Sequence, residues 1–415
     1  MREWKKYKLS EIATLSNGIN FDKSAYTSGV KLIGVADFKD RIYPDYESLQ
    51  EVDSKVVRRG DYLEKGDIVF VRSNGNKELV GRCMMIDRDI PVTYSGFCIK
   101  LHLIDKNLFE PVYFNYLFRT RKFRKAMTGT AVGANIQNLS QARLGNCEVN
   151  IPDIETQIRI ATILSRYDTL IENCQKQIKL LEEAAQRLYK EWFVELRFPG
   201  HENTKMVDGL PEGWKTTKLG QLAEFKRGKT ITKKEAIEGN IPVVAGGLEP
   251  AYYCDKSNTT NRVITISGSG ANAGYTRMYF EKVWASDCSF ADTSTTDYLH
   301  FVFCFLRENK TVIDNMQKGA AQPHVYAKDI NSMELLLPIK KILILHEQRV
   351  SRFFDTIESL QSQIRLLTEA RDRLLPRLMG GEMEVDAPKG QRAINPVHRS
   401  GYNPQTNHAP KGQKN

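Results

Sequence analysis

The strongest constraint on how this chain folds is that its sequence repeats itself. The stretch Ser165–Leu188 aligns without gaps to Ser351–Leu374, and thirteen of the twenty-four aligned positions hold the same residue. A shorter match relates the segment that begins at Trp4 to the segment that begins at Trp214, because each has Trp-Lys, Lys-Leu and Ala at the same spacing. Between these matches the two halves have almost nothing in common. The sequence therefore predicts two copies of one unit, each a variable segment followed by a shared helix.

The first shared segment has the apolar spacing of a narrow two-helix contact, which we call the seam. Apolar or small residues recur at alternating steps of four and three for more than four heptads. No Pro or Gly lies between Pro152 and Pro199, so one helix of about 40 residues and about 60 Å is expected there. Its seam residues are Ile160, Leu164, Tyr167, Ile171, Cys174, Ile178, Leu181, Ala185, Leu188 and Trp192.

The second shared segment repeats this seam with two irregularities. Arg371 interrupts it, and Pro376 is expected to kink the last turns before Gly380 and Gly381 end the helix. Two matched seams in one chain predict an intramolecular antiparallel coiled coil; the alternative is that each helix packs only against its own globular domain. The seam residues here are Val350, Phe353, Ile357, Leu360, Ile364, Leu367, Leu374 and Leu378.

The variable segments mix short β-type stretches, such as 67–72 and 262–267, with helical stretches. The expected fold class is therefore α/β (mixed α+β), with two such domains, two long helices and a pseudo-twofold internal repeat. Pairs such as Gly18 and Gly228 also coincide between the two domains. The predicted boundaries are 1–151 and 200–337 for the domains, 152–199 and 338–382 for the helices, and 383–415 for a disordered basic tail.

Each variable segment closes with a loop of small residues, at 129–138 and at 319–326. Backbone-rich loops with amide and imidazole side chains suit hydrogen bonding to base edges, and nearby cations suit phosphates. The alternative is that these are ordinary connections between a helix and a strand. The candidate DNA-contacting residues are Arg72, Asn74, Lys77, Asn135, Gln137, Lys226, Arg227, Lys229, Gln322 and His324.

Other classes of protein fit this sequence poorly. The seven cysteines have neither C-x-x-C spacing nor a His partner at zinc-ligand spacing, so reduced thiols and no metal are expected. Residues 223–230 fit a relaxed phosphate-loop pattern, but a helical lead-in precedes them and the loop interior has no glycine. No membrane span or signal peptide is expected. The net charge of +10 permits an anionic partner without proving one.

Taken together, the order of these features resembles the specificity subunits of type I restriction-modification systems. The resemblance rests on the duplicated Trp-Lys openings, the Ile151-Pro152 and Leu337-Pro338 pairs, and the Glu/Gln-containing starts of both helices. The repeated Q-x-Q-I-x-L-L-x-E-A stretch completes it. About 380 of the 415 residues are covered.

This resemblance implies a chain that is not itself an enzyme and binds no cofactor. Each variable segment would be a target recognition domain for one half of a split, asymmetric sequence in double-stranded DNA, and the coiled coil would set the gap between the halves. Two modification subunits would dock on the helices, bind S-adenosylmethionine and methylate adenine. Motor-nuclease subunits that use ATP and Mg would cleave unmodified DNA, as a cytoplasmic defence against phage. The competing hypothesis is a coiled-coil scaffold that does not read sequence.

Overall fold

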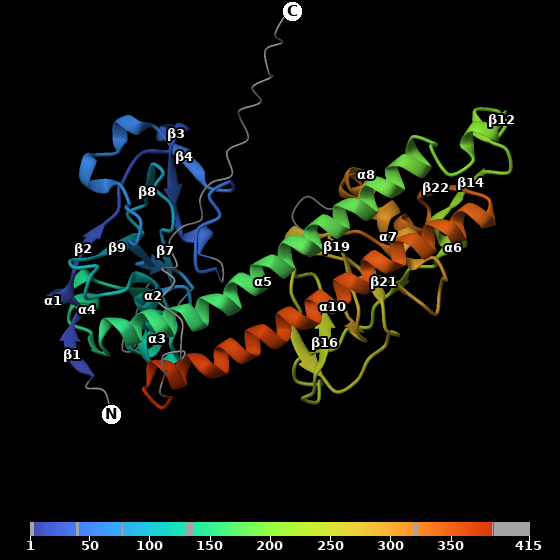
Figure 1. Cartoon of the computed structure of the whole chain (residues 1–415). Helices are drawn as coiled ribbons and strands as arrows, with labels where there is room; N and C mark the ends of the chain where they lie inside the picture. The colour runs from blue at the N-terminus through green and yellow to red at the C-terminus, as the bar shows by residue number, and fades with distance from the viewer. Residues whose placement is uncertain are drawn as a thin grey trace, which may run out of the picture. The chain divides into compact units, whose positions relative to one another are not determined.

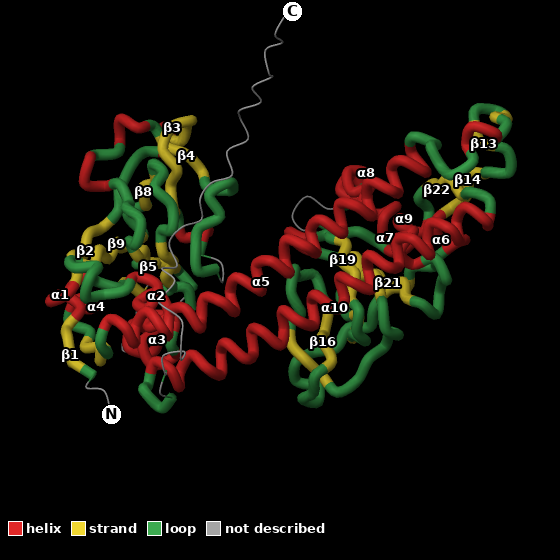
Figure 2. Tube along the Cα trace, viewed as in Figure 1, coloured by secondary structure: helices red, strands yellow, loops and turns green. Residues whose placement is uncertain are grey.

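The computed structural model describes residues 4–38, 41–76, 78–128, 137–318, 323–383 and 385. The chain divides into two compact units, Met1–Thr169 with Leu367–Asn415, and Leu170–Leu366. Each unit holds one mixed domain of strands and short helices together with a stretch of both long helices (Figure 1, Figure 2). The fold class predicted from the sequence is confirmed. Among the described residues, no helix combines the length and apolar character needed to cross a membrane.

The first domain is built on two small sheets that share a buried interior. Strand β5 is one of the two inner strands of the larger sheet, and its four residues are completely buried. This run of β-branched and aromatic residues is apolar on both faces because helix α2 covers one side and a second hydrophobic cluster covers the other. The larger sheet has the order β2 (Ala13–Asn17), β9 (Cys98–Leu103), β5 (Ile68–Val71), β7 (Cys83–Met85), and the smaller has β4 (Gln50–Val52), β3 (Tyr26–Ile33), β8 (Val92–Tyr94).

The first and last strands of the first domain pair with each other before the chain continues into the long helix. Strand β1 (Lys5–Lys8) pairs antiparallel with the domain's last strand, β11 (Glu148–Ile151). The chain therefore ends the domain beside the place where it began it. The short helices are α1 (Leu9–Ile12), α2 (Pro111–Arg119), α3 (Arg121–Thr128) and α4 (Gln141–Gly145), and a two-residue ladder joins β6 (Ser73–Asn74) to β10 (Gln137–Asn138).

The second domain repeats this order of elements, although its sequence has diverged. Its larger sheet has the order β15 (Lys226–Arg227), β21 (Cys288–Asp292), β18 (Val263–Ser267), β19 (Thr276–Tyr279), and its smaller sheet has β17 (Tyr252–Cys254), β16 (Ile241–Val244), β20 (Trp284–Ala285). Strand β14 (Lys215–Lys218) pairs with β22 (Glu334–Leu337), as β1 pairs with β11. The other elements are β12 (Met206–Val207), β13 (Leu210–Pro211), α6 (Leu219–Leu222), α7 (Leu299–Glu308), α8 (Lys310–Asn315) and α9 (Ala327–Asn331).

Two glycines show why a few positions match across otherwise divergent domains. The amide of Gly18 donates to the carbonyl of Cys98 at 3.2 Å, and that of Gly228 donates to Cys288 at 2.8 Å. A Cβ at either glycine would lie 2.3 Å from a backbone carbonyl oxygen, of Ser95 in one domain and of Ser286 in the other. Only glycine allows the backbones to approach this closely.

The two long helices are α5 (Ile154–Tyr189), extended by a π-helical turn at Lys190–Val194, and α10 (Lys340–Met379). Pro376 lies inside α10, which ends as predicted just before Gly380, and Gly381 has a φ of +71°. The predicted long helices are confirmed, whereas the exact domain boundaries stay a prediction. The proposed tail lies outside the described residues, apart from Met383 and Val385.

Within each unit the two helices run antiparallel. In the first unit Arg371 of α10 lies 2.5 Å from Asp168 of α5, and in the second unit the thiol of Cys174 lies 3.9 Å from the Gln363 side chain. Every predicted seam residue is buried or half-buried, whereas the charged residues between them are mostly exposed. The alternative also holds in part, because α10 packs against the second domain as well as against α5.

Two polar residues occupy the seam at non-equivalent places. His346 stands where the first helix has Ile160, and Arg371 stands where the first helix has Ala185. The Arg371 and Asp168 side chains are only 15% and 19% exposed, and the Tyr116 hydroxyl also donates to Asp168. The interruption at Arg371 is therefore matched by a partner carboxylate, which avoids an uncompensated charge.

Candidate nucleic-acid interface

The first domain brings two of its predicted contact segments side by side. Asn74 pairs with Gln137 and Ser73 pairs with Asn138 in the β6–β10 ladder. The amide of Leu139 then donates to the carbonyl of Arg72 at 2.8 Å. The extension of β5 and the end of the 129–138 loop thus form one edge. We call this edge the first reading edge, defined by residues 72–74 and 137–138.

The second domain builds the same edge from different residues. The amide of Val325 donates to the carbonyl of Gly268 at 3.1 Å, and Ser269 forms an isolated bridge with His324. Gly268 therefore corresponds to Arg72, and His324 corresponds to Asn138. The second reading edge is defined by residues 268–270 and 324. Equivalent backbone positions thus carry different side chains in the two domains.

Side chains at the first reading edge are partly occupied in holding the loop. Arg72 is half-buried, and its Nη1 donates to the carbonyl of Gly96 at 3.2 Å. Asn74 accepts a 2.7 Å hydrogen bond from the amide of Asn76, which makes a local turn. Each side chain keeps further donors in addition to these bonds. Their role as DNA contacts stays a prediction.

The basic candidates of the second domain lie along a sheet edge. Lys226 and Arg227 form the edge strand β15, and both are exposed, as is Lys229. The amides of Gly228 and Lys229 donate to the carbonyls of Cys288 and Ala285. These amides cannot cradle a phosphate, so the phosphate-loop interpretation of residues 223–230 does not hold. Exposed cations on an edge strand suit DNA phosphates, and they also protect the edge from pairing with another chain.

His324 lies in a short row of residues that the sequence reasoning missed in part. Its ring is nearly parallel to that of Tyr326, with a centroid separation of 6.0 Å and an interplanar angle of 14°. The ammonium of Lys328 lies 5.8 Å from the centre of the same tyrosine ring. Tyr326 is 39% exposed. His324 and Tyr326 alternate in the extended segment that leads into helix α9, and Lys328 lies in the first turn of that helix.

Several candidate residues cannot be placed. Lys77, Asn135 and Gln322 lie outside the described residues, and only the backbone of Gln137 is described. They stay predictions.

The cysteines match the expectation of reduced thiols, since all seven are unpaired. Burial is the main cause that raises the pKa of Cys98 and of Cys288 to about 12, which disfavours the thiolate that binds metals. Among the described residues no group of His, Cys, Asp and Glu side chains is arranged to hold a metal ion.

Comparison with known proteins identifies the family. The family model described as the type I restriction modification DNA specificity domain matches residues 1–183 and 211–369. The chain belongs to this family. Its two matched regions contain both mixed domains and most of each long helix, so the whole repeated architecture is accounted for.

Individual relatives agree with this assignment. The MjaIX specificity subunit of a type I restriction enzyme from Methanocaldococcus jannaschii is 28% identical over 310 residues, which are 69% of this chain and 72% of the relative. The EcoKI specificity subunit of Escherichia coli K12 is 20% identical over 440 residues, with 96% and 92% covered. The crystal structure of a type I S subunit from M. genitalium has a TM-score of 0.57 and 18% identity, with 91% of this chain and 96% of that chain covered, and it shares the fold.

Family membership gives this chain the role of DNA specificity in a type I restriction-modification system. The alternative of a coiled-coil scaffold that does not read sequence is not favoured.

Proposed function

We propose that each domain reads one half of a bipartite, asymmetric sequence in double-stranded DNA. The observation that carries this proposal is the pair of reading edges, which share one backbone pattern but differ in side chains. Asparagine amides line the first edge, whereas a histidine and glycines line the second. Different hydrogen-bonding groups at equivalent places recognise different bases. Two unlike half-sites follow from two unlike edges.

The long helices then act as the spacer between half-sites. A single α-helix of the length of α5 extends about 54 Å, at about 1.5 Å per residue. Paired helices resist bending, so the distance between the readers is fixed by the number of heptads. Two linked readers also gain affinity because binding of the first raises the effective concentration of the second.

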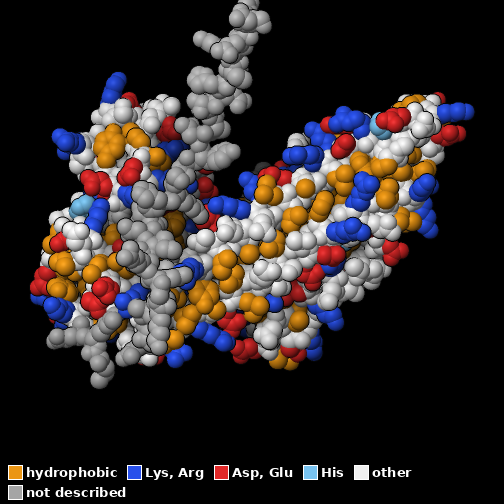
Figure 3. Space-filling view, viewed as in Figure 1, with side chains coloured by type: hydrophobic (Ala, Val, Ile, Leu, Met, Phe, Trp, Pro, Cys, Tyr) orange, Lys and Arg blue, Asp and Glu red, His pale blue; other side chains and the backbone are white. Residues whose placement is uncertain are grey.

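The outward surface of the helices supports docking of two copies of one partner, the modification subunit. Leu180 is 63% exposed, and its repeat equivalent Leu366 is 62% exposed. Hydrophobic side chains are visible on the outer surface of the long helices (Figure 3). The same four residues recur in both helices at positions outside the seam. Contact between the two helices does not explain why these residues are the same, whereas contact with two copies of one partner does. The repeated strip is Leu180, Glu183, Ala184 and Arg187 in α5, and Leu366, Glu369, Ala370 and Arg373 in α10.

On this proposal the chain itself is non-catalytic and acts in the cytoplasm. Modification subunits supply S-adenosylmethionine-dependent methylation of adenine, and motor-nuclease subunits supply ATP- and Mg-dependent cleavage. No residue of this chain needs to take part in either reaction.

The test is to produce the chain together with its modification subunits and to sequence the methylated bases of the host genome. We expect one split motif with unlike halves, a fixed gap and methylated adenine in each half. A continuous motif, or no sequence preference, would contradict the proposal. Exchange of residues 1–151 for another first domain should change one half-site only, and a change in both would refute independent reading.

A further inference from the structure

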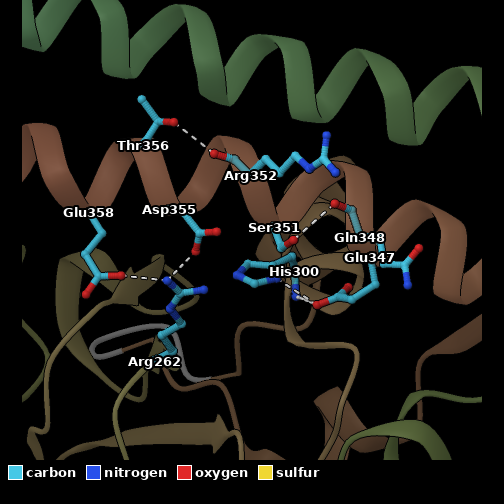
Figure 4. Close-up of polar contacts among 9 residues, drawn as sticks. All are labelled: Arg262, His300, Glu347, Gln348, Ser351, Arg352, Asp355, Thr356 and Glu358. Atoms are coloured by element: carbon cyan, nitrogen blue, oxygen red, sulfur yellow. Dashed lines mark hydrogen bonds and ion pairs between the residues drawn. The ribbon is translucent and has the colours of Figure 1, made fainter.

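Arg262 joins the second domain to the long helix α10. Its Nη2 atom lies 2.5 Å from Asp355 Oδ1 and 2.6 Å from Glu358 Oε2, and all three residues belong to the second unit (Figure 4). The Arg262 side chain is 25% exposed. One guanidinium nitrogen is therefore shared by two carboxylates one turn apart on the helix.

A second polar contact lies further toward the start of α10. The Glu347 carboxylate accepts hydrogen bonds from the backbone amides of His300, at 3.2 Å, and Phe301, at 3.0 Å. It also lies 2.7 Å from His300 Nδ1 (Figure 4). These amides belong to the first turn of α7, where a carboxylate is favoured by the helix dipole.

An apolar contact separates the two polar ones. Phe354 is 2% exposed, and its ring stacks on His300 at 4.8 Å and meets Phe303 at 5.6 Å. Glu347, Phe354 and Glu358 are spaced by seven and four residues, so they share one side of the helix. This side lies beside the seam but does not belong to it. The second domain therefore contacts α10 at three successive places along one side of the helix.

The backbone of Arg262 is unusual for a residue with a side chain. Its φ is +58°, in the left-handed region that favours glycine. Strand pairing shows that the equivalent residue of the first domain is Gly66, with a φ of +95°, because Ser267 pairs with Cys288 as Val71 pairs with Cys98. The second domain thus places an arginine where the first domain has a glycine. The ion pairs with α10 offset the free-energy cost of the left-handed backbone conformation at Arg262.

Arg262 also stands directly before the strand that leads to the second reading edge. Strand β18 follows at Val263–Ser267, and all five of its residues are buried. The next residue, Gly268, accepts the hydrogen bond from Val325 that forms the edge. A single buried strand therefore connects the ion pairs on α10 with the second reading edge.

We propose that Arg262 is a positioning residue for DNA recognition: through Asp355 and Glu358 it fixes the rotation of the second domain on α10, and so the spacer length at which the second half-site is accepted. The contact is specific to the second domain. Gly66 stands in the place of Arg262 in the first domain, and the repeat position of Asp355 is Thr169. The repeat position of Glu358 is Glu172, which pairs with Lys176 of its own helix. The inference rests on the proposed bipartite reading.

The test uses the complex with its modification subunits and duplexes that carry the motif with its natural spacer, or with one base pair more or fewer. In Arg262→Ala and Arg262→Gly, discrimination against the altered spacers should fall about tenfold, the effect of about one charge-assisted hydrogen bond, while the preferred bases stay the same. Arg262→Lys should keep most of the discrimination. Asp355→Ala with Glu358→Ala should reproduce the loss. Arg262→Gly removes the backbone strain, so the fold is retained.

Arg277→Ala is the matched control, because Arg277 pairs with Glu249 and both residues lie within the second domain. Unchanged spacer discrimination in the Arg262 variants would overturn the proposal, as would an equal loss of methylation at every spacer. A changed half-site, with no effect of the Asp355 and Glu358 substitutions, would mean that Arg262 contacts DNA directly. Failure of the bipartite function itself would appear earlier, as a wild-type complex without a split motif.

Discussion

His346 offers a sharp test of how the second unit is held together. It is completely buried in the seam, and neither ring nitrogen has a hydrogen-bond partner among the described residues. The nearest aromatic ring is that of Phe193, at 4.9 Å between centroids. Burial, with a smaller contribution from His300, lowers the pKa of His346 from 6.5 to about 3. The native protein therefore holds this imidazole neutral.

The sign of the pH effect follows from the direction of this pKa change. Below pH 6.5 the unfolded chain binds a proton at His346 that the native chain does not bind, so acid favours unfolding. The stabilisation is complete above pH 6.5 and is lost as the pH falls toward about 3. At about 1.4 kcal/mol per pH unit the whole effect is about 5 kcal/mol, and about 2 kcal/mol of it falls between pH 7 and pH 5.

The assay is urea unfolding of the full chain at pH 7 and pH 5, in the wild type and in His346→Ile, which places the residue of the first helix in the second. The variant should lose about 2 kcal/mol less than the wild type on acidification, a difference of about 1 M urea in the midpoint. His201→Leu, at a half-exposed histidine of the same unit, should keep the wild-type response. Equal pH dependence in His346→Ile and the wild type would refute the reasoning.

Three further predictions concern the helices. Arg371→Ala should destabilise the first unit by about 2 kcal/mol. This loss is smaller than for a fully buried ion pair, because the Arg371 and Asp168 side chains are 15% and 19% exposed. A double-mutant cycle with Asp168→Ala measures the coupling between the two residues, and additive effects would contradict it. Leu180→Asp with Leu366→Asp should abolish co-purification of the modification subunits without changing the unfolding midpoint, whereas Leu248→Asp, at another exposed leucine, should not. Deletion of one heptad from each long helix should change the spacer in the methylated motif and leave both halves intact, and an unchanged spacer would exclude the ruler.

The secondary structure of the helices was predictable because a seam is a local property. Its residues are apolar or small and recur at alternating steps of four and three. This spacing predicts a helix, identifies the side of the helix that is buried, and indicates a second helix as the partner. The exception was His346, which is buried one step before Val350, where the predicted seam of the second helix began. A ring surrounded by Tyr189 and Trp192 can be recognised only after the domain has folded around it.

The candidate site was predictable only in its general location. The sequence pointed to the loops at 129–138 and 319–326, and their role in DNA contact stays a prediction. The pairing of residues 137–138 with 73–74, and of His324 with Ser269, depends on long-range hydrogen bonds that the sequence does not show. Tyr326 and Lys328 were missed because their exposure is a tertiary property. Arg262 was also missed, since nothing in its neighbours indicates a left-handed backbone or a carboxylate ninety-three residues away.

The sequence by itself determined that this chain is a duplicated unit of a variable domain and a shared helix, because repetition and heptad spacing are written in residue order. The tertiary structure alone decided that the diverged domains share one backbone pattern, in which equivalent edges carry different side chains. It also decided how the second domain is held on α10. Strand pairing and ion pairs between distant residues are set by the folded chain as a whole, and local sequence does not specify them.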